Sequence, residues 1–254
     1  MASKDKIPVS EIFGPTIMGE GLFAGMPTVF LRTAACDYYD VCLKCDSMHA
    51  VDPNKFTGVA KTMTSIEVVA RLMEQIGETG CEWVTISGGN PALWDLSDVV
   101  TALHAREINV CVETQGSIFK TWLCDCDVVH IAPKGPGMVA NAILSRSVFE
   151  DFMDKYTRCL DPARVLTCIK IPIFGAPDLD FAESIAEAWP VFNMSLSVGN
   201  NHPPGDGIGD SFVQSAVMLS YRRIIEEVLK RPKLMHATIL PQLHVLVYGN
   251  KQGV

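Results

Sequence analysis

Three cysteines lie close together in the segment CDYYDVCLKCD (36–46), where Cys36, Cys42 and Cys45 have the spacing C-x5-C-x2-C. Clustered thiolates can bind a metal ion or an iron-sulfur cluster, and neighbouring thiols can also form disulfides or have no joint role. A structural zinc ion needs four ligands, usually in two pairs, and this triplet has no evident fourth protein ligand. The open position could hold water in a zinc enzyme, or a bound cofactor on a four-iron cluster.

The remaining cysteines are expected to have no part in this site. Cys124 and Cys126 are one residue apart, which is too close for the usual zinc knuckle, and they precede a predicted strand, at the opposite end of the sheet. Four others lie in or beside predicted core elements and are expected to be small buried hydrophobes: Cys81, Cys111, Cys159 and Cys168.

The cellular compartment expected from the sequence argues against disulfides. The N-terminus MASKDKIPVS has no apolar signal core, and no apolar run approaches the ~20 residues needed to cross a bilayer. We therefore expect a cytoplasmic protein without membrane contact, in a compartment that keeps thiols reduced.

Composition and charge indicate a globular protein that acts on a small molecule. The chain has 254 residues, of which 48% are hydrophobic and 20% are charged, so it can bury a sizeable core. Its net charge is −8, and its basic residues are scattered. Proteins that bind nucleic acid usually carry a basic face, so no nucleic-acid partner is expected.

Strand-like and helix-like segments alternate along almost the whole chain. Sequence patterns predict strands at 27–34, 82–87, 108–113, 127–132, 165–171 and 192–198, and helices at 64–77, 96–107, 145–156, 178–189 and 211–231. The first helix has capping-box residues Thr64 and Glu67 at its start and Gly77 at its end. Its expected apolar face consists of Ile66, Val69, Ala70 and Met73.

This alternation predicts a parallel sheet with right-handed crossovers. We expect an α/β fold, with residues 1–254 forming a single domain built as a partial or modified (β/α) barrel of about six parallel strands; a doubly wound open sheet is the alternative. Polar or glycine-rich segments follow all six strands: CDYYDVCLKCDS, SGGNP, ETQGS, APKGPG, FGAPD and SVGNNHPPGDG. Active sites form at the carboxyl ends of parallel strands, so this one-sided placement favours an enzyme.

The cysteine triplet after the first predicted strand and SGGNP after the second resemble those of a radical S-adenosylmethionine enzyme. The match extends over EIFGPTIMGEG (11–21), LRTAACDY (31–38), KCDS (44–47), TISGGNPAL (85–93), ETQGS, APK and LPQLHVLVYGNKQGV (240–254). Together these segments are similar to the 7-carboxy-7-deazaguanine synthase family. The resemblance runs from residue 8 to 254 and is weakest at 135–165.

The resemblance implies a lyase that converts 6-carboxy-5,6,7,8-tetrahydropterin into 7-carboxy-7-deazaguanine and ammonia, a step toward queuosine and related deazaguanines. It implies a [4Fe-4S] cluster on Cys36, Cys42 and Cys45, S-adenosylmethionine on the fourth iron, and Mg²⁺ beside the substrate. It also implies a homodimer, an electron donor such as flavodoxin or ferredoxin, and a C-terminal tail that binds the pterin.

The cysteine spacing departs from the superfamily's usual C-x3-C-x2-C by two residues. The added length falls within residues 37–41. Lengthening a loop costs only ~0.6 kcal/mol per doubling of its length. We therefore expect the insertion to bulge outward and all three cysteines to bind one cluster.

The family's cofactor contacts match residues beside the triplet and after later strands. They are Lys44, Cys45, Asp46, Gly88, Gly89, Asn90, Ala132, Pro133, Lys134, Ser197, Val198, Gly199 and Asn200. Relatives usually have Glu at Asn90, Ser at Ala132 and Gln at Ser197, and the last two are expected to act through their backbone. Taken alone, Gly88 and Gly89 would also fit an ordinary strand-to-helix turn.

The family's substrate contacts match one arginine and two acids, to which we assign catalytic roles. Arg32 is expected to face the pterin carboxylate, and Glu20 and Glu113 its aminopyrimidinone. Further substrate contacts are expected from Ile17, Met18, Gly19, Ser87 and Val254, with Gln242 and His244 as additional tail residues. Without the resemblance, Arg32 could equally pair with a nearby acid, and the glutamates could be solvated loop residues.

Ser47 is the protein ligand that we expect for Mg²⁺. The family has Thr or Ser at this position, and a hard cation suits an oxygen ligand and keeps several of its waters. The alternative role for Ser47 is that of a turn residue or helix cap.

Two other functions are open from the sequence. A different radical S-adenosylmethionine enzyme, such as an activase or a peptide-modifying enzyme, would share the triplet and the glycine loop but not ETQGS and the C-terminal tail. A zinc-stabilised binding module without catalysis would be colourless, whereas a protein with an iron-sulfur cluster is brown.

Overall fold

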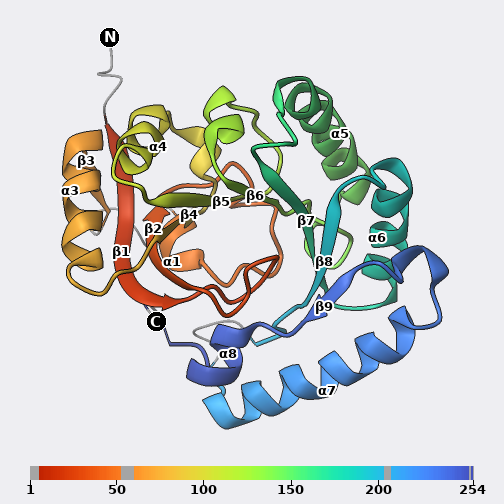
Figure 1. The fold of residues 1–254 in the computed structure, drawn as a ribbon. Coiled ribbons are helices and arrows are strands. Elements are labelled where there is room, and N and C mark those ends of the chain that lie inside the picture. Colours follow the sequence, from red (N-terminus) through yellow and green to blue (C-terminus); the bar gives the residue numbers. More distant parts are fainter. Residues whose placement is uncertain (1–5, 53–59, 203–206, 252, 254) are drawn as a thin grey trace.

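The computed structural model describes residues 6–52, 60–202, 207–251 and 253 (Figure 1). Its sheet has nine strands in the order β3-β1-β2-β4-β5-β6-β7-β8-β9. The strands are β1 (Ile7–Ile17), β2 (Pro27–Thr33), β3 (Lys61–Met63), β4 (Trp83–Gly88), β5 (Asn109–Thr114), β6 (Val128–Ile131), β7 (Leu166–Ile173), β8 (Asn193–Val198) and β9 (Thr238–Leu240). The helices are α1 (Met48–Val51), α3 (Ser65–Ile76), α4 (Ser97–His104), α5 (Ala142–Cys159), α6 (Ala176–Ala188), α7 (Asp210–Val228) and α8 (Leu243–Tyr248).

The sheet confirms the predicted partial barrel. All strands from β2 to β9 except β3 pair in parallel. Figure 1 shows the sheet curling, with α3, α4, α5 and α6 along its outer side. In the described part of the chain the order ends at β3 on one edge and β9 on the other, so the barrel is open.

All six predicted strands and five predicted helices are present, but β1, β3 and β9 were not expected. β1 pairs antiparallel with β2 and carries register shifts at two places, one of them between Phe13 and Thr16, around Gly14 and Pro15. Because a strand with a proline and shifted register has no regular two-residue alternation, its sequence gave little indication of a strand.

Residues on the two faces of the parallel strands differ in chemical character. On the outer face, Val84, Ile86, Val110 and Val112 are fully buried in the main core, together with side chains of the outer helices. Alternate residues point the other way, because successive strand side chains lie on opposite faces. This inner face is largely polar and includes Ser87, Cys111, Glu113, His130, Lys170 and Ser197.

The predicted ends of α3 are correct, and the predicted apolar face is correct for Val69, which is buried, and Met73, which packs against the core, but wrong for Ile66 and Ala70. Thr64 and Glu67 form the capping box, and Gly77 ends the helix with a φ of 48°. The buried face is Val68, Val69, Leu72 and Ile76. Ile66 is 82% exposed, and Ala70 is also exposed. The sheet therefore packs on the stripe with more large aliphatic side chains, which buries more apolar area.

Three of the four cysteines that were expected to be buried are buried, and Cys159 is the exception. Cys81, Cys111, Cys124, Cys126 and Cys168 are buried, whereas Cys159 is exposed. Cys159 is the last residue of α5, at the end of the helix, which explains why the prediction of burial failed. No helix in the described ranges is long and apolar enough to cross a membrane.

The face of α3 can be tested by mutation. Leu72→Ala should lower the free energy of unfolding by about 2–5 kcal/mol, because it opens a cavity under a fully buried side chain. Ile66→Ala removes an exposed side chain and should change it by less than about 0.5 kcal/mol. Urea unfolding followed by circular dichroism measures both; equal losses would contradict the observed orientation.

Candidate active site

One pocket at the carboxyl ends of the parallel strands gathers most of the predicted site residues. Those that line it are Ile17, Met18, Gly19, Glu20, Arg32, Cys36, Cys42, Lys44, Cys45, Asp46, Ser47, Ser87, Gly88, Gly89, Glu113, Ala132, Lys134, Gly199 and Asn200, with the tail residues Gln242 and His244. Asn90, Pro133, Ser197 and Val198 are not among the lining residues. Val254 lies outside the described residues.

Hydrogen bonds hold the cysteine loop against the neighbouring strand ends. Asn90 N–H donates to the Ala35 carbonyl over 3.0 Å, and Leu43 N–H donates to Met138 over 2.8 Å. Cys42 pairs with Val139 in an isolated antiparallel bridge. The two segments flanking the insertion are therefore fixed by loops that follow β4 and β6.

The inserted residues turn outward, as expected. Tyr39, Asp40 and Val41 are exposed, and Val41 N–H and Cys42 N–H both donate to the Tyr38 carbonyl in a tight turn. The longer spacing is thus accommodated in a surface turn, and all three thiols still line the pocket.

The three thiols are protonated near neutral pH in the absence of a metal. Burial raises the pKa of Cys45 to about 12, and Asp46 adds to the effect. Burial also raises the pKa of Cys36 and Cys42, while Lys134 acts in the opposite direction on Cys42. Metal binding to these thiols must therefore release protons.

The arrangement of the thiols is compatible with a cluster. Among the described residues, no three His, Cys, Asp or Glu side chains converge on one point as ligands of a single metal ion would. The cysteine ligands of a four-iron cluster bind different iron atoms and stand around it. Cys36, Cys42 and Cys45 all line one pocket, which fits this requirement.

Asn90 is buried behind the pocket wall and supports the cysteine loop. It is fully buried, and its side-chain oxygen accepts from Thr114 Oγ1 (2.9 Å) and from the Ala92 N–H (3.2 Å). Its side-chain nitrogen donates to Asp37 Oδ1 (2.8 Å), which also accepts from Gln115 Nε2 (2.7 Å). Asp37 is the residue next to Cys36, and these hydrogen bonds join it to the loops after β4 and β5.

Gly88 and Gly89 are required by the chain's own packing as well as by the pocket that they line. A Cβ on Gly88 would lie 2.4 Å from the Thr33 carbonyl oxygen, and one on Gly89 would lie 2.1 Å from that of Ala35. Both contacts are with backbone that cannot move aside. The glycine pair therefore allows the cysteine loop to pack closely on the end of β4.

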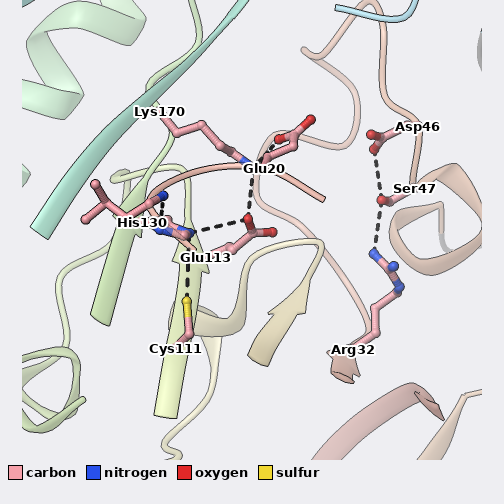
Figure 2. Close-up of polar contacts among 9 residues, drawn as sticks. Glu20, Arg32, Asp46, Ser47, Cys111, Glu113, His130 and Lys170 are labelled. Carbon is pink, nitrogen blue, oxygen red and sulfur yellow. Dashed lines mark hydrogen bonds and ion pairs between the residues drawn. The ribbon is translucent and has the colours of Figure 1, made fainter. Parts of the chain in front are cut away.

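Arg32 pairs with a nearby acid, which is one of the two possibilities considered for it. Its Nε donates to Glu11 Oε1 (2.6 Å), and its Nη1 donates to Ser47 Oγ (3.2 Å). Ser47 in turn donates to Asp46 Oδ1 (2.9 Å), and Figure 2 shows this chain of three side chains. The guanidinium is thus paired with an acid but still lines the pocket.

Lys170 is a site residue that the sequence analysis missed. Its Nζ lies 2.5 Å from Glu20 Oε2 and 2.9 Å from Glu113 Oε1 (Figure 2). Burial would raise the pKa of Glu113, but Lys170 and His130 hold it well below its usual value. Burial would likewise lower the pKa of Lys170, but the two carboxylates raise it well above its usual value.

Two buried polar atoms in the pocket wall have no partner among the described residues. They are Ser87 Oγ and Gln242 Oε1. Such groups cost free energy unless a ligand or water satisfies them. Their position fits a pocket that binds a polar molecule.

Phe174 and the C-terminal tail form the remaining walls of the pocket. Lys44 Nζ lies 4.3 Å from the centre of the Phe174 ring and donates to Asn201 Oδ1 over 2.8 Å. A Cβ on Gly199 would clash with Phe174, so this glycine lies flat on the ring. Leu243 N–H donates to the Gly19 carbonyl (3.0 Å), which fixes the tail beside the loop after β1.

Replacing Asp37 with Ala should lower the iron content of the reconstituted protein. The change removes the shared acceptor of the Asn90 and Gln115 amides, at a cost of about 1–3 kcal/mol, and releases the segment that holds Cys36. Iron per chain after anaerobic reconstitution measures the effect. Asp40→Ala, in the same turn but without a hydrogen bond to Asn90 or Gln115 among the described residues, is the matched control; equal iron in both variants would show that Asp37 does not position Cys36.

Comparison with known proteins identifies the family, although no family model matches the chain. The chain is 35% identical over 251 residues to 7-carboxy-7-deazaguanine synthase of Bacillus subtilis, covering 98% of each chain. It is 34% identical over 250 residues to the enzyme of that name from Bacillus cereus, covering 98% of this chain and 99% of the other.

Two crystal structures share the fold. QueE from Escherichia coli matches with a TM-score of 0.64 at 18% identity, over 94% of this chain and 95% of the other. SuiB from Streptococcus suis matches with a TM-score of 0.52 at 10% identity, over 88% of this chain and 50% of the other. With the sequence relatives covering both chains almost completely, this chain belongs to the 7-carboxy-7-deazaguanine synthase family of radical S-adenosylmethionine lyases.

Proposed function

We propose that this lyase of deazaguanine biosynthesis converts 6-carboxy-5,6,7,8-tetrahydropterin to 7-carboxy-7-deazaguanine and ammonia in the pocket described above. The observation that supports it most is that three cysteines, Arg32 and two glutamates line the same pocket. Identity to the synthases over almost the entire chain favours this reaction over that of an activase or a peptide-modifying enzyme.

Family membership implies a [4Fe-4S] cluster and S-adenosylmethionine. Cys36, Cys42 and Cys45 would hold the cluster, and their presence around one pocket fits it. When bound, the two groups supply the radical chemistry, through one-electron cleavage of the sulfonium C–S bond. The protein's part is to bind, orient and exclude water.

S-adenosylmethionine would bind between the cysteine loop and the strand ends that follow it. Gly88, Gly89, Ala132, Lys134, Gly199 and Asn200 line this part of the pocket. Phe174 offers a flat apolar face beside Lys44. Pro133, Ser197 and Val198 would act only by shaping the wall, since Ser197 and Val198 are buried.

The pterin would bind against the inner face of the sheet and the loop after β1. Glu20 and Glu113 accept hydrogen bonds and suit the N–H groups of an aminopyrimidinone, and Ser87 Oγ is an available hydroxyl. Arg32 would attract the carboxylate in competition with Glu11. Ile17, Met18 and Gly19 would complete the wall, with Val254 contributing from the tail.

The partners expected of the family belong to the same proposal. The enzyme would work as a cytoplasmic homodimer that receives electrons from a flavodoxin or ferredoxin. It would act as one domain, and it would bind neither nucleic acid nor a membrane.

An anaerobic assay tests the reaction. Reconstituted protein given the pterin, S-adenosylmethionine and a reductant should release 7-carboxy-7-deazaguanine, and Cys42→Ala should lower the rate by at least about 10³-fold because a cluster ligand is lost. Cys159→Ala, which removes an exposed thiol at the end of α5, should keep the wild-type rate. A wild-type protein that forms no product would refute the proposed function.

A second assay tests Ser47 as the Mg²⁺ ligand. Ser47→Ala should lower kcat/KM at saturating Mg²⁺ by roughly tenfold or weaken the response to added Mg²⁺, because one oxygen ligand of a hard cation is lost. Ser47→Thr keeps the hydroxyl and is the control that should retain both. An unchanged rate and an unchanged Mg²⁺ titration in Ser47→Ala would remove this residue from the metal site.

A further inference from the structure

Lys170 places a cation between two carboxylates on the inner face of the sheet. The Lys170 side chain is 12% exposed, and those of Glu20 and Glu113 are 11% and 23% exposed. The three residues come from β7, the loop after β1, and β5, which are distant in the sequence. An ion triplet this well shielded from water requires good geometry, since burying charges is costly.

The lysine places a positive charge between the two acids. Two carboxylates in one buried site repel each other, and without a cation one of them takes up a proton. A protonated carboxyl group offers a donor where an N–H group of a ligand needs an acceptor. Lys170 lies between the two acids and offsets one of their two formal charges, which leaves a combined formal charge of −1.

The contacts also leave a defined oxygen free on each acid. Glu113 Oε1 faces both Lys170 Nζ and His130 Nδ1, which lies 3.7 Å away. His130 Nε2 accepts a hydrogen bond from the Leu22 N–H (3.2 Å), which assigns the proton of a neutral ring to Nδ1. Glu20 uses Oε2 for Lys170. No hydrogen bond or ion pair within the described ranges engages Glu113 Oε2 or Glu20 Oε1.

We propose that Lys170 is a positioning residue that turns Glu20 and Glu113 into a paired acceptor for the donor edge of the substrate's aminopyrimidinone, and so sets specificity for a ring that carries an amino group. This inference rests on the proposed function. A ring with oxygen in place of the amino group presents an acceptor to these acids and leaves them unpaired, which is the type of mismatch that polar sites reject strongly.

Equilibrium binding to the reconstituted enzyme without reductant tests the proposal. The probes are 6-carboxypterin and 6-carboxylumazine, which has oxygen in place of the 2-amino group. The wild type should bind 6-carboxypterin more tightly by at least about tenfold. Lys170→Met should weaken 6-carboxypterin binding by at least about tenfold and bring the ratio of the two Kd values close to one. Lys170→Arg keeps the cation and should restore most of the ratio.

Controls separate this role from a structural one. Lys155→Met removes an exposed lysine paired with Asp151 and should leave both Kd values unchanged. Lys170→Met leaves two buried acids without a cation, so this variant could unfold. The double variant Lys170→Met/Glu20→Gln avoids this, because it removes one charge of each sign. It is compared with Glu20→Gln alone. The double variant should discriminate less between the probes than Glu20→Gln does.

The outcomes distinguish the inference from the function on which it rests. An unchanged ratio of Kd values in Lys170→Met, or equal ratios in the double variant and Glu20→Gln, would overturn the role of Lys170 while the proposed reaction stands. Failure of the wild type to bind 6-carboxypterin would overturn the proposed function and this inference together.

Discussion

The parallel ladder from β2 to β9 is the constraint on which the site depends, because parallel strands end at one edge of the sheet and alternate their side chains between two faces. The outer face supplies the apolar core beneath the helices. The inner face is then free to be polar, and its register brings Arg32 opposite Ser87 and Glu113 opposite His130. Stability and chemistry are thus divided between the two faces of the same strands.

The pocket holds its charges in compensated groups. Arg32 is paired with Glu11, and Lys170 lies between Glu20 and Glu113. Each pairing lowers the cost of removing charge from water and fixes the direction of the remaining donors and acceptors. A ligand therefore meets side chains that are already oriented, which reduces the ordering cost of binding.

The sequence predicted the features that depend on local pattern and on family motifs. It did not predict features that depend on contacts between segments distant in the sequence. Alternating patterns located six strands and five helices, and the motif residues converge on one pocket. The buried face of α3 depends on which of its side chains pack against the sheet. Lys170 could have been suspected as a lysine in an apolar strand, VLTCIKI, but its partners come from β5 and the loop after β1.

The most direct test of this account is an anaerobic crystal structure with S-adenosylmethionine and 6-carboxy-5,6,7,8-tetrahydropterin bound. The account predicts one [4Fe-4S] cluster on Cys36, Cys42 and Cys45, and the pterin's N–H edge within ~3 Å of the free oxygens of Glu20 and Glu113. A pterin bound away from these two acids, or a cluster that does not use all three cysteines, would contradict it.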